Sequence, residues 1–311
     1  MPENWRIMLK YGVIGTGAIG GYYGAKLAHA GKEVHFLFHR DYEFVCQNGL
    51  QVDSCDGSFH LDRVNAYHST QDMPQCDVVF VCLKSINNHL LDELLPPLLH
   101  QHTLVVLIQN GIGLEEDLQQ RFPHVNLAAG LAFICSAKTE SGRVNHQCYG
   151  YINLGNYSCP DEELLQQIIS DFTEAGVDAH LVEYHEARWK KAVWNMPFNG
   201  MTVALSTQTD VLLKQPATLK LIQDMMLEVI NTAQQLGVNI PHSFADKMIQ
   251  NTLDMTPYSP SMKLDYDFHR PMEIYYLYTR PLQEAKKHGL SMPKLEMLEA
   301  ELKFLEEKNK H

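Results

Sequence analysis

The feature that most constrains the chain is a glycine-rich turn between a short apolar run and a helix-like stretch. The apolar run ends at Ile14, and the G-x-G-x-x-G pattern that follows it is formed by Gly15, Gly17 and Gly20. A helix-like segment over residues 22–30 and a second β-rich run from Val34 come next. A strand, this turn, a helix and a second strand in that order are typical of a dinucleotide-binding unit.

The three glycines have separate roles in such a turn. Gly15 permits the sharp change of direction, Gly17 lets a pyrophosphate approach the backbone, and Gly20 lets the helix pack closely on the strand. The first N–H groups of the helix then face the phosphates and carry a partial positive charge. We therefore expect the cofactor to bind at six consecutive residues, Gly15, Thr16, Gly17, Ala18, Ile19 and Gly20.

The end of the second strand indicates which nicotinamide cofactor is preferred. NAD-binding proteins tend to place an acidic residue there, about 20 residues after the glycines, to bind the ribose 2′-hydroxyl. Here the strand ends in Phe38, His39 and Arg40. A cationic side chain suits a 2′-phosphate, so the sequence predicts NADP(H), held by His39 or Arg40. Asp41 comes next, and its carboxylate would weaken this preference. The alternative is that Asp41 only starts the following turn.

The first half of the chain alternates short apolar runs with helix-like segments. The runs predict strands over residues 11–14, 34–38, 78–83 and 104–108. They are apolar nearly throughout, which is typical of parallel strands covered by helices on both faces. The alternation predicts an α/β fold with a Rossmann-type doubly wound parallel sheet. Three more elements are expected, an added strand pair over 143–154, a helix over 161–175 and a strand over 179–182.

Beyond residue 185 the strand signal ends. Apolar side chains recur at three- and four-residue steps over residues 219–236 and again over 295–305. This spacing is typical of amphipathic helices, the first of which should end at Gly237. A chain of 311 residues is long enough for two domains. We expect a Rossmann domain over 1–184 and an all-helical C-terminal domain over 185–311.

Composition excludes several classes of protein. The formal net charge of -12 would repel nucleic acid and anionic membranes, and no apolar run approaches the roughly 18 residues needed to span a bilayer. The seven cysteines are scattered without C-x-x-C spacing, so we expect reduced thiols and no metal site. The N-terminus has no signal-peptide pattern. Together these observations predict a cytoplasmic location.

Two predicted strands end in polar side chains. The third strand is followed by Lys84 and the fourth by Gln109, Asn110 and Gly111. In open α/β sheets ligands bind beyond the carboxyl ends of the strands, so Lys84 and Asn110 are candidates to contact the nicotinamide half of the cofactor. The alternative for Lys84 is an ordinary solvated lysine. The alternative for Asn110 is that it forms an ordinary turn with Gly111.

The strongest candidate for catalysis is a polar stripe on a predicted helix. Lys191, Asn195 and Asn199 are spaced four residues apart, which places all three on one face. Asparagine is a poor helix former, and a buried amide without partners costs about 1 to 3 kcal/mol, whereas a polar substrate would satisfy it. The alternative is that the asparagines hydrogen-bond core backbone. Pro197 should kink this helix.

A second polar patch includes Ser261 and Glu273. Pro271 suits the first turn of a helix, and Glu273 would then lie close to the helix N-terminus, where a carboxylate is favoured. The alternative for Glu273 is a charge that only stabilises the helix start.

Taken together, these motifs resemble those of the ketopantoate reductase family. The matching pieces are the N-terminal glycine turn, Leu83-Lys84, Asn110-Gly111-Ile112-Gly113, Trp189-Lys190-Lys191 with Asn195 and Asn199, Ser261-Met262, and Arg270-Pro271-Met272-Glu273-Ile274. Their order and intervals span essentially the whole chain, which is far more specific than any single motif.

The resemblance implies NADPH-dependent reduction of the keto group of 2-dehydropantoate (ketopantoate) or a similar 2-oxo acid, and a role in pantothenate biosynthesis. It implies that Lys191 is the general acid and that Glu273 holds substrate or lysine. It also implies that residues 185–311 bind the substrate, in a cleft against the NADP-binding domain. Cofactor contacts are implied for Lys84 and Asn110, and substrate contacts for Asn110, Asn195, Asn199 and Ser261. A homodimer is a further expectation.

Several positions depart from the family pattern. Thr209 occupies the place of a third asparagine, Tyr258 replaces another asparagine, and Tyr275 and Tyr276 follow Glu273 where acidic and Asn-Gly residues are common. These differences leave two alternatives open. One is a reductase of the same fold that acts on another 2-oxo or β-hydroxy acid, and the other is a non-catalytic NADP-binding sensor.

Overall fold

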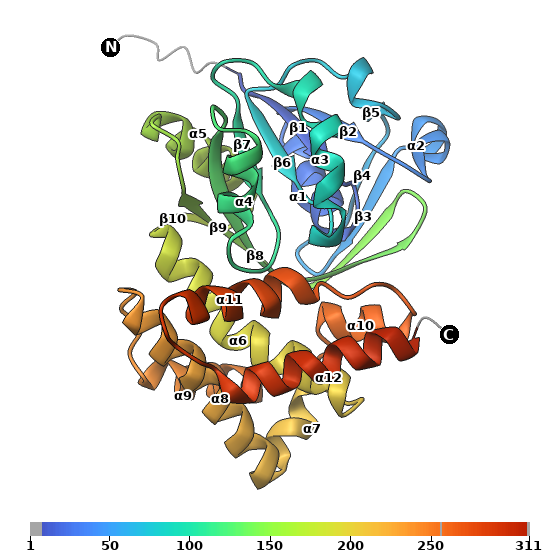
Figure 1. Cartoon of the computed structure of the whole chain (residues 1–311). Helices are drawn as coiled ribbons and strands as arrows, with labels where there is room; N and C mark the ends of the chain where they lie inside the picture. Colours follow the sequence, from blue (N-terminus) through green and yellow to red (C-terminus); the bar gives the residue numbers. More distant parts are fainter. Residues whose placement is uncertain (1–7, 256, 310–311) are drawn as a thin grey trace. The chain divides into compact units, whose positions relative to one another are not determined.

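The structure, a computed structural model, describes residues 8–255 and 257–309. Residues 1–7 and 310–311 lie outside these ranges. They include the start of the N-terminal stretch that lacks a signal-peptide pattern, and the outer ends of both expected domains. The chain divides into two compact units (Figure 1). The first unit is formed by Met1–Gln109 and Glu115–Tyr184, and the second by Asn110–Leu114 and His185–His311. Within the second unit, the Ile112 N–H donates to the Tyr276 carbonyl at 3.0 Å.

The first unit is built on a mostly parallel sheet, as predicted. Its strand order is β4-β3-β9-β8-β7-β6-β1-β2-β5, with β10 beside β9. The strands that carry the cofactor motifs are parallel neighbours: β1 (Lys10–Ile14), β2 (Glu33–Leu37), β6 (Val78–Val81) and β7 (Leu104–Leu107). β5 (Asn65–Tyr67) pairs parallel with β2. The others are β3 (Leu50–Ser54), β4 (Phe59–Leu61), β8 (Asn126–Glu140), β9 (Arg143–Asn156) and β10 (Ala179–Val182).

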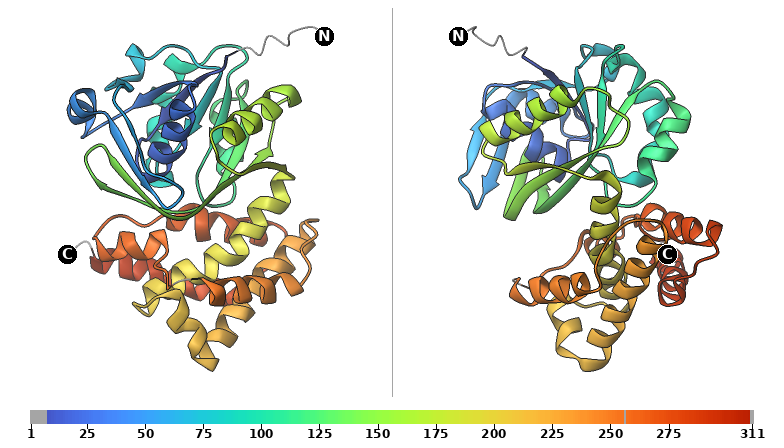
Figure 2. Two further views of the ribbon diagram at one scale, coloured as in Figure 1. Left: turned by 180° about the vertical axis from the view of Figure 1, so that it is seen from behind. Right: turned by 90° about the vertical axis from the view of Figure 1, so that its left-hand side faces the viewer.

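Helices cover both faces of this sheet, which explains why its central strands are apolar throughout. Helices α1 (Ala18–His29) and α5 (Glu162–Glu174) contact each other on one face, and α3 (Leu91–Leu94) and α4 (Leu114–Arg121) lie on the other (Figure 2). The Tyr11 hydroxyl donates to the Asp171 carboxylate at 2.6 Å and joins β1 to α5. Helix α2 (Tyr42–Asn48) follows β2.

The prediction of a strand pair over residues 143–154 is wrong. These residues belong to one strand, β9, which pairs antiparallel with β8, a strand that the sequence analysis missed. The turn between them lies at Ser141 and Gly142, before the predicted range begins, and Gly142 has a φ of +64°. A glycine adopts this left-handed conformation without the strain that a Cβ atom causes.

In residues 185–309, apart from residue 256, the second unit contains no strand, as predicted. Its longest helices are α6 (Tyr184–Ala204), α8 (Pro216–Gln235) and α12 (Pro293–Asn309). Helix α6 continues through Pro197 as one element. The remaining helices are α7 (Thr209–Lys214), α9 (Ser243–Asp254), α10 (Ser261–Asp267) and α11 (Arg280–Lys287), the last preceded by the π-helical turn η4 (Tyr275–Thr279).

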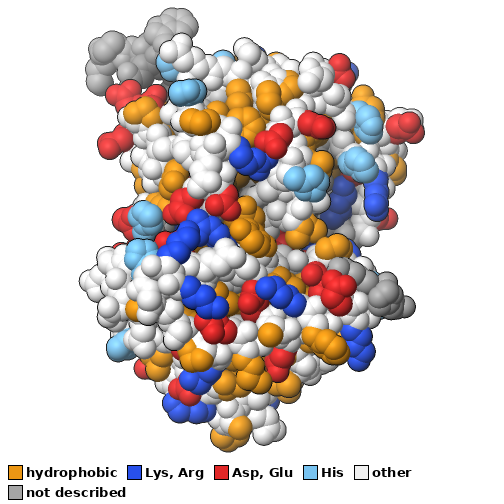
Figure 3. All heavy atoms as spheres, in the orientation of Figure 1, with side chains coloured by type: hydrophobic (Ala, Val, Ile, Leu, Met, Phe, Trp, Pro, Cys, Tyr) orange, Lys and Arg blue, Asp and Glu red, His pale blue; other side chains and the backbone are white. Residues whose placement is uncertain are grey.

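The surface mixes charges of both signs. Figure 3 shows Lys and Arg side chains interspersed with Asp and Glu on the face drawn, without a large continuous basic area. Among the helices of the described residues, none is both long enough and apolar enough to cross a bilayer.

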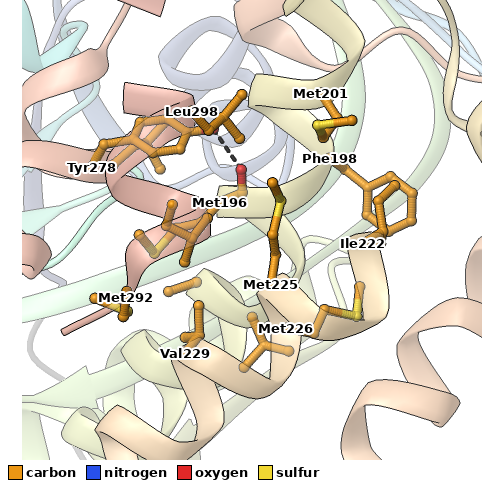
Figure 4. Close-up of a cluster of buried hydrophobic side chains, with 14 of the residues drawn as sticks. Met196, Phe198, Met201, Ile222, Met225, Met226, Val229, Tyr278, Met292 and Leu298 are labelled. Carbon is orange, nitrogen blue, oxygen red and sulfur yellow. Dashed lines mark hydrogen bonds between the residues drawn. The ribbon is translucent and has the colours of Figure 1, made fainter. Parts of the chain in front are cut away.

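The core of the second unit holds α6 in place. Met196 of α6 packs among buried side chains that include Met225 and Val229 of α8 and Leu298 of α12 (Figure 4). The Tyr278 hydroxyl donates to the Met196 carbonyl at 2.6 Å. Because α6 is fixed by this core, the polar stripe on it is carried by a rigid element.

Candidate functional site

The glycine turn connects β1 to α1, as the sequence predicts. Gly15 has a φ of +93°, and a Cβ atom there would lie 2.7 Å from the Leu83 backbone nitrogen. A Cβ atom at Gly20 would lie 2.5 Å from the Gly15 carbonyl oxygen. Both glycines are therefore required for the turn to fold close to β6 and for α1 to pack on β1.

Gly17 differs from the other two glycines because the space around it is open. It occupies the N-cap position of α1 without a side-chain cap, and no atom outside its immediate neighbours lies within 4 Å of the position of its Cβ. The first N–H groups of a helix lack partners within the helix. The turn therefore offers backbone N–H donors beside open space, an arrangement that suits a pyrophosphate.

Thr16 ties the turn to the neighbouring strand, because its hydroxyl donates to the Leu37 carbonyl at 2.9 Å. Beyond that strand, His39 and Arg40 are exposed, and the ring of His39 stacks on His68 with 6.4 Å between centroids. Asp41 instead turns inward and is 5% exposed. The structure therefore exposes the two candidate phosphate-binding side chains and buries the acidic one.

The ends of β6 and β7 meet at the same edge of the sheet as the glycine turn, because β6 lies between β1 and β7. The Gln109 amide donates to the Leu83 carbonyl and to the Asn88 side chain, at 2.7 Å each. This pairing fixes the segment in which half-buried Lys84 follows β6. The sequence analysis gave Gln109 no role, although it directly follows the fourth predicted strand.

A small pocket in the second unit brings together Lys191 and Asn195 of α6. The other lining residues are Gly111, Ile112, Arg188, Ala192, Tyr276 and Leu277. Asn195 is 7% exposed. The predicted stripe on α6 therefore supplies an amine and an amide to one enclosed space.

The electrostatics of this pocket favour proton transfer near neutral pH. Burial, together with the positive charge of Arg188 one helical turn earlier, lowers the pKa of Lys191 from its ordinary value of 10.5 to about 7. An amine with this pKa is present in both its protonated and its neutral form at neutral pH, which suits a general acid.

The third member of the stripe, Asn199, is not among the pocket's lining residues. It is 3% exposed, its amide donates to the Asn195 carbonyl at 2.9 Å, and its side-chain oxygen accepts from the Met262 N–H at 3.4 Å. These contacts favour the structural alternative, in which Asn199 anchors the start of α10. Ser261, the first residue of α10, is exposed next to this anchor.

Glu273 lies half-buried just before the first helical residue, Ile274. The prediction that Pro271 occupies the first turn of this helix is wrong, because residues 271–273 are not helical and the helix begins at Ile274. Glu273 nevertheless precedes a helix N-terminus, where a carboxylate is stabilised.

The Gly111 segment gives a first prediction about stability. Gly111 has a φ of +123°, and a Cβ atom there would lie 2.6 Å from the Tyr276 carbonyl oxygen. We expect Gly111→Ala to lower the free energy of unfolding by about 2 to 4 kcal/mol. Gly237→Ala is the control, since Gly237 has a φ of +86° but open space around it. Urea unfolding of both variants separates the clash from the backbone strain, and equal losses would contradict the proposed clash.

One group of possible metal ligands lies elsewhere in the first unit, formed by Cys55, Asp56 and His146. His146 is engaged on both ring nitrogens, with Ser54 Oγ at 2.8 Å from Nδ1 and the Tyr149 carbonyl at 3.0 Å from Nε2. The protein itself therefore satisfies this histidine.

Comparisons with known proteins identify the family of the chain. A family model described as Ketopantoate reductase PanE/ApbA matches residues 11–158, and a second, described as Ketopantoate reductase PanE/ApbA C terminal, matches residues 183–306. The 2-dehydropantoate 2-reductase of a Nostoc species is 45% identical over 307 residues, which cover 97% of this chain and 96% of that relative.

Solved structures give the same result. A 2-dehydropantoate 2-reductase from Geobacter metallireducens has a TM-score of 0.91 at 37% identity, covering 96% of this chain and 99% of that one. A ternary structure of D-mandelate dehydrogenase with NADH and anilino(oxo)acetate shares the fold, with a TM-score of 0.87 at 21% identity, over 97% of this chain and 100% of that one. The chain therefore belongs to the ketopantoate reductase family, whose members are pyridine-nucleotide-dependent oxidoreductases acting on CH–OH groups.

Proposed function

We propose that this protein reduces the keto group of 2-dehydropantoate, or of a similar 2-oxo acid, to the 2-hydroxy acid with NADPH, in pantothenate biosynthesis. The observation that carries the proposal is the pocket in which Lys191, with a pKa of about 7, lies one helical turn from Asn195. The 45% identical Nostoc relative is named for this substrate.

The pocket residues suit the charge changes of ketone reduction. A reduced nicotinamide, when bound, supplies the hydride. Negative charge then develops on the keto oxygen, and the Lys191 ammonium both stabilises that charge and donates the proton. In the proposal the Asn195 amide, on the same helix, holds an oxygen of the 2-oxo acid. Burial favours this role, because a desolvated ammonium acts more strongly on a developing oxyanion than a hydrated one does.

The other site residues have supporting roles in the proposal. The glycine turn holds the pyrophosphate, and His39 or Arg40 holds the 2′-phosphate. Lys84 and Asn110 contact the cofactor near its nicotinamide ring, and Ser261 and Glu273 bind substrate. A substrate contact from Asn199 stays a prediction, since its amide is engaged by backbone. A homodimer and a cytoplasmic location stay predictions as well.

The pKa of Lys191 predicts the pH dependence of the reaction. The protonated amine is the acid, so kcat/KM for reduction should be level below about pH 7 and fall about tenfold per pH unit above it. Arg188→Gln removes a charge that lowers this pKa, and should move the falling limb to higher pH. Initial rates from pH 5.5 to 9.5 with both proteins test this. A limb that stays in place in Arg188→Gln would show that Arg188 does not control the titrating group.

The test of the function is to mix the protein with NADPH and a panel of 2-oxo acids, and to follow the loss of absorbance of the reduced cofactor. We expect the highest kcat/KM with 2-dehydropantoate or a close analogue. Preference for a different 2-oxo or β-hydroxy acid would support the first alternative. Tight NADPH binding without turnover of any compound would support the sensor, although a sensor gives no reason for Lys191 and Asn195 to share a pocket.

A further inference from the structure

We propose that Lys138, on β8, sets the preference for NADPH over NADH by holding Asp41 away from the cofactor's ribose. Lys138 is a positioning residue in this proposal, because it acts through Asp41. The inference rests on the proposed binding of NADP(H) at the glycine turn and goes beyond it, since it identifies what keeps an acidic residue from opposing the 2′-phosphate.

The contacts of Asp41 come from the tip of the β8–β9 hairpin. The Asp41 carboxylate lies 2.5 Å from the Lys138 amine and accepts from the Gly142 N–H at 3.2 Å. The side chain of Asp41 is 6% exposed, and that of Lys138 is 29% exposed. The hairpin thus supplies both a charge and a backbone donor to one carboxylate, and buries it.

The same amine also contacts the cofactor turn. Lys138 Nζ donates to the Thr16 carbonyl at 3.1 Å. Thr16 in turn donates its hydroxyl to the Leu37 carbonyl, at the end of β2. Lys138 therefore joins the two segments that would bind the pyrophosphate and the 2′-phosphate, and it places a positive charge between them.

The position of Asp41 explains why this pairing affects specificity. An acidic residue near the end of the second strand favours NADH, because a carboxylate accepts a hydrogen bond from the ribose 2′-hydroxyl and repels a 2′-phosphate. Asp41 directly follows His39 and Arg40, which are exposed. Without Lys138 its carboxylate would lose its charge partner and would offset the charge of Arg40. With Lys138 present, the charge of the Asp41 carboxylate is balanced. His39 and Arg40 then determine the charge that a 2′-phosphate meets at this surface.

The alternative is that Lys138 only anchors the hairpin. The two roles differ in their effect on the two cofactors. NADPH and NADH differ only in the 2′-phosphate, so a distortion of the glycine turn would weaken both alike. A charge effect through Asp41 would weaken NADPH selectively. The ratio of the two dissociation constants therefore separates the roles.

The experiment measures the Kd of NADPH and of NADH from their fluorescence on binding to the full-length protein, together with kcat/KM for each. The variants are Lys138→Met, Asp41→Asn, the double variant, and Lys138→Arg, which keeps the charge. Arg143→Met is the matched control, because Arg143 is a cation of the same hairpin that pairs with Asp53 instead.

We expect Lys138→Met to lower the NADPH preference, Kd(NADH)/Kd(NADPH), by about tenfold, which corresponds to about 1.4 kcal/mol. The double variant should regain a ratio within about threefold of the wild type, because the carboxylate is gone. Lys138→Arg and Arg143→Met should keep the ratio. Equal weakening of both cofactors in Lys138→Met, or a loss that persists in the double variant, would overturn the proposal. If Lys138→Met does not fold, Asp41→Asn decides alone, since a selective loss of NADPH binding in that variant contradicts the inference.

Failure of the proposed function has a different outcome. If the wild-type protein binds neither cofactor, or prefers NADH, then NADP(H) itself is wrong, whatever Lys138 does. If the wild type prefers NADPH and Arg40→Gln reduces that preference while Lys138→Met does not, the cofactor assignment stands and the role of Lys138 alone is rejected.

Discussion

Replacing Lys191 by methionine is expected to lower kcat for reduction of the accepted 2-oxo acid by about 100- to 10,000-fold, the usual contribution of a positioned general acid. Methionine keeps the length of the apolar stem and removes the proton donor. The KM for NADPH should change by less than about threefold, because in this account Lys191 serves the reacting oxygen rather than the nucleotide phosphates. Steady-state kinetics with both substrates varied give these values.

Lys190→Met is the matched control for this substitution. Lys190 is the neighbouring lysine on α6, where it pairs with Glu186 and does not line the pocket. We expect its kcat to stay within about threefold of the wild type, since exposed ion pairs contribute little. Equal losses in Lys190→Met and Lys191→Met would contradict a specific role for Lys191.

Lys191→Met should also be more stable than the wild-type protein at neutral pH. The folded-state pKa of Lys191, about 7, lies below the ordinary 10.5, so the unfolded chain binds more protons between these pH values. The stability of the wild type therefore rises with pH across this window, and the cost of burying the amine is largest below pH 7. We expect Lys191→Met to raise the free energy of unfolding by about 1 to 3 kcal/mol at pH 7 and by less at pH 10. A loss of activity that accompanies a gain in stability cannot result from misfolding.

The second large effect is expected at Gly17. A Cβ atom there would meet no atom within 4 Å, so a valine side chain would enter the open space at the start of α1 and exclude the pyrophosphate. We expect Gly17→Val to weaken NADPH binding by at least about a hundredfold, or about 2.7 kcal/mol. The loss in unfolding free energy should be about 1 to 2 kcal/mol. The φ of Gly17, -88°, is open to L-residues, but its ψ of -148° lies outside the regular β region, and valine is a poorer N-cap than glycine.

Gly20→Val provides the contrast, because its Cβ atom would lie 2.5 Å from the Gly15 carbonyl oxygen. This variant should lose stability rather than binding alone. Fluorescence titration with NADPH and thermal unfolding distinguish the two outcomes. Undiminished NADPH binding in Gly17→Val would contradict the placement of the pyrophosphate at this turn.

The spacing of residue types within short segments was sufficient to predict the parts of the fold that depend on one segment alone. The glycine turn, the apolar parallel strands and the helical second half all follow from residue spacing within one element. The stripe on α6 is of the same kind, since Lys191 and Asn195 share a helix face by their spacing and do line one pocket.

Features that depend on pairing distant segments were missed. Strand β8 was not predicted, and so Lys138 was not recognised, although it contacts Asp41 across 97 positions of the chain. Gly111 and Tyr276 line the pocket from segments 165 positions apart. The periodicity of residues within one segment cannot predict contacts between two distant segments. For the same reason the sequence left open whether Asn199 binds a ligand or the backbone.

The central claim is that the ammonium of Lys191 supplies the proton to the keto oxygen. Its most direct test is the pH profile of kcat/KM for the wild type and for the residual activity of Lys191→Met, measured with the same 2-oxo acid. The account predicts a falling limb near pH 7 in the wild type that is absent from the variant, where water must supply the proton. A limb that persists at the same pH in Lys191→Met would assign the titrating acid to another group.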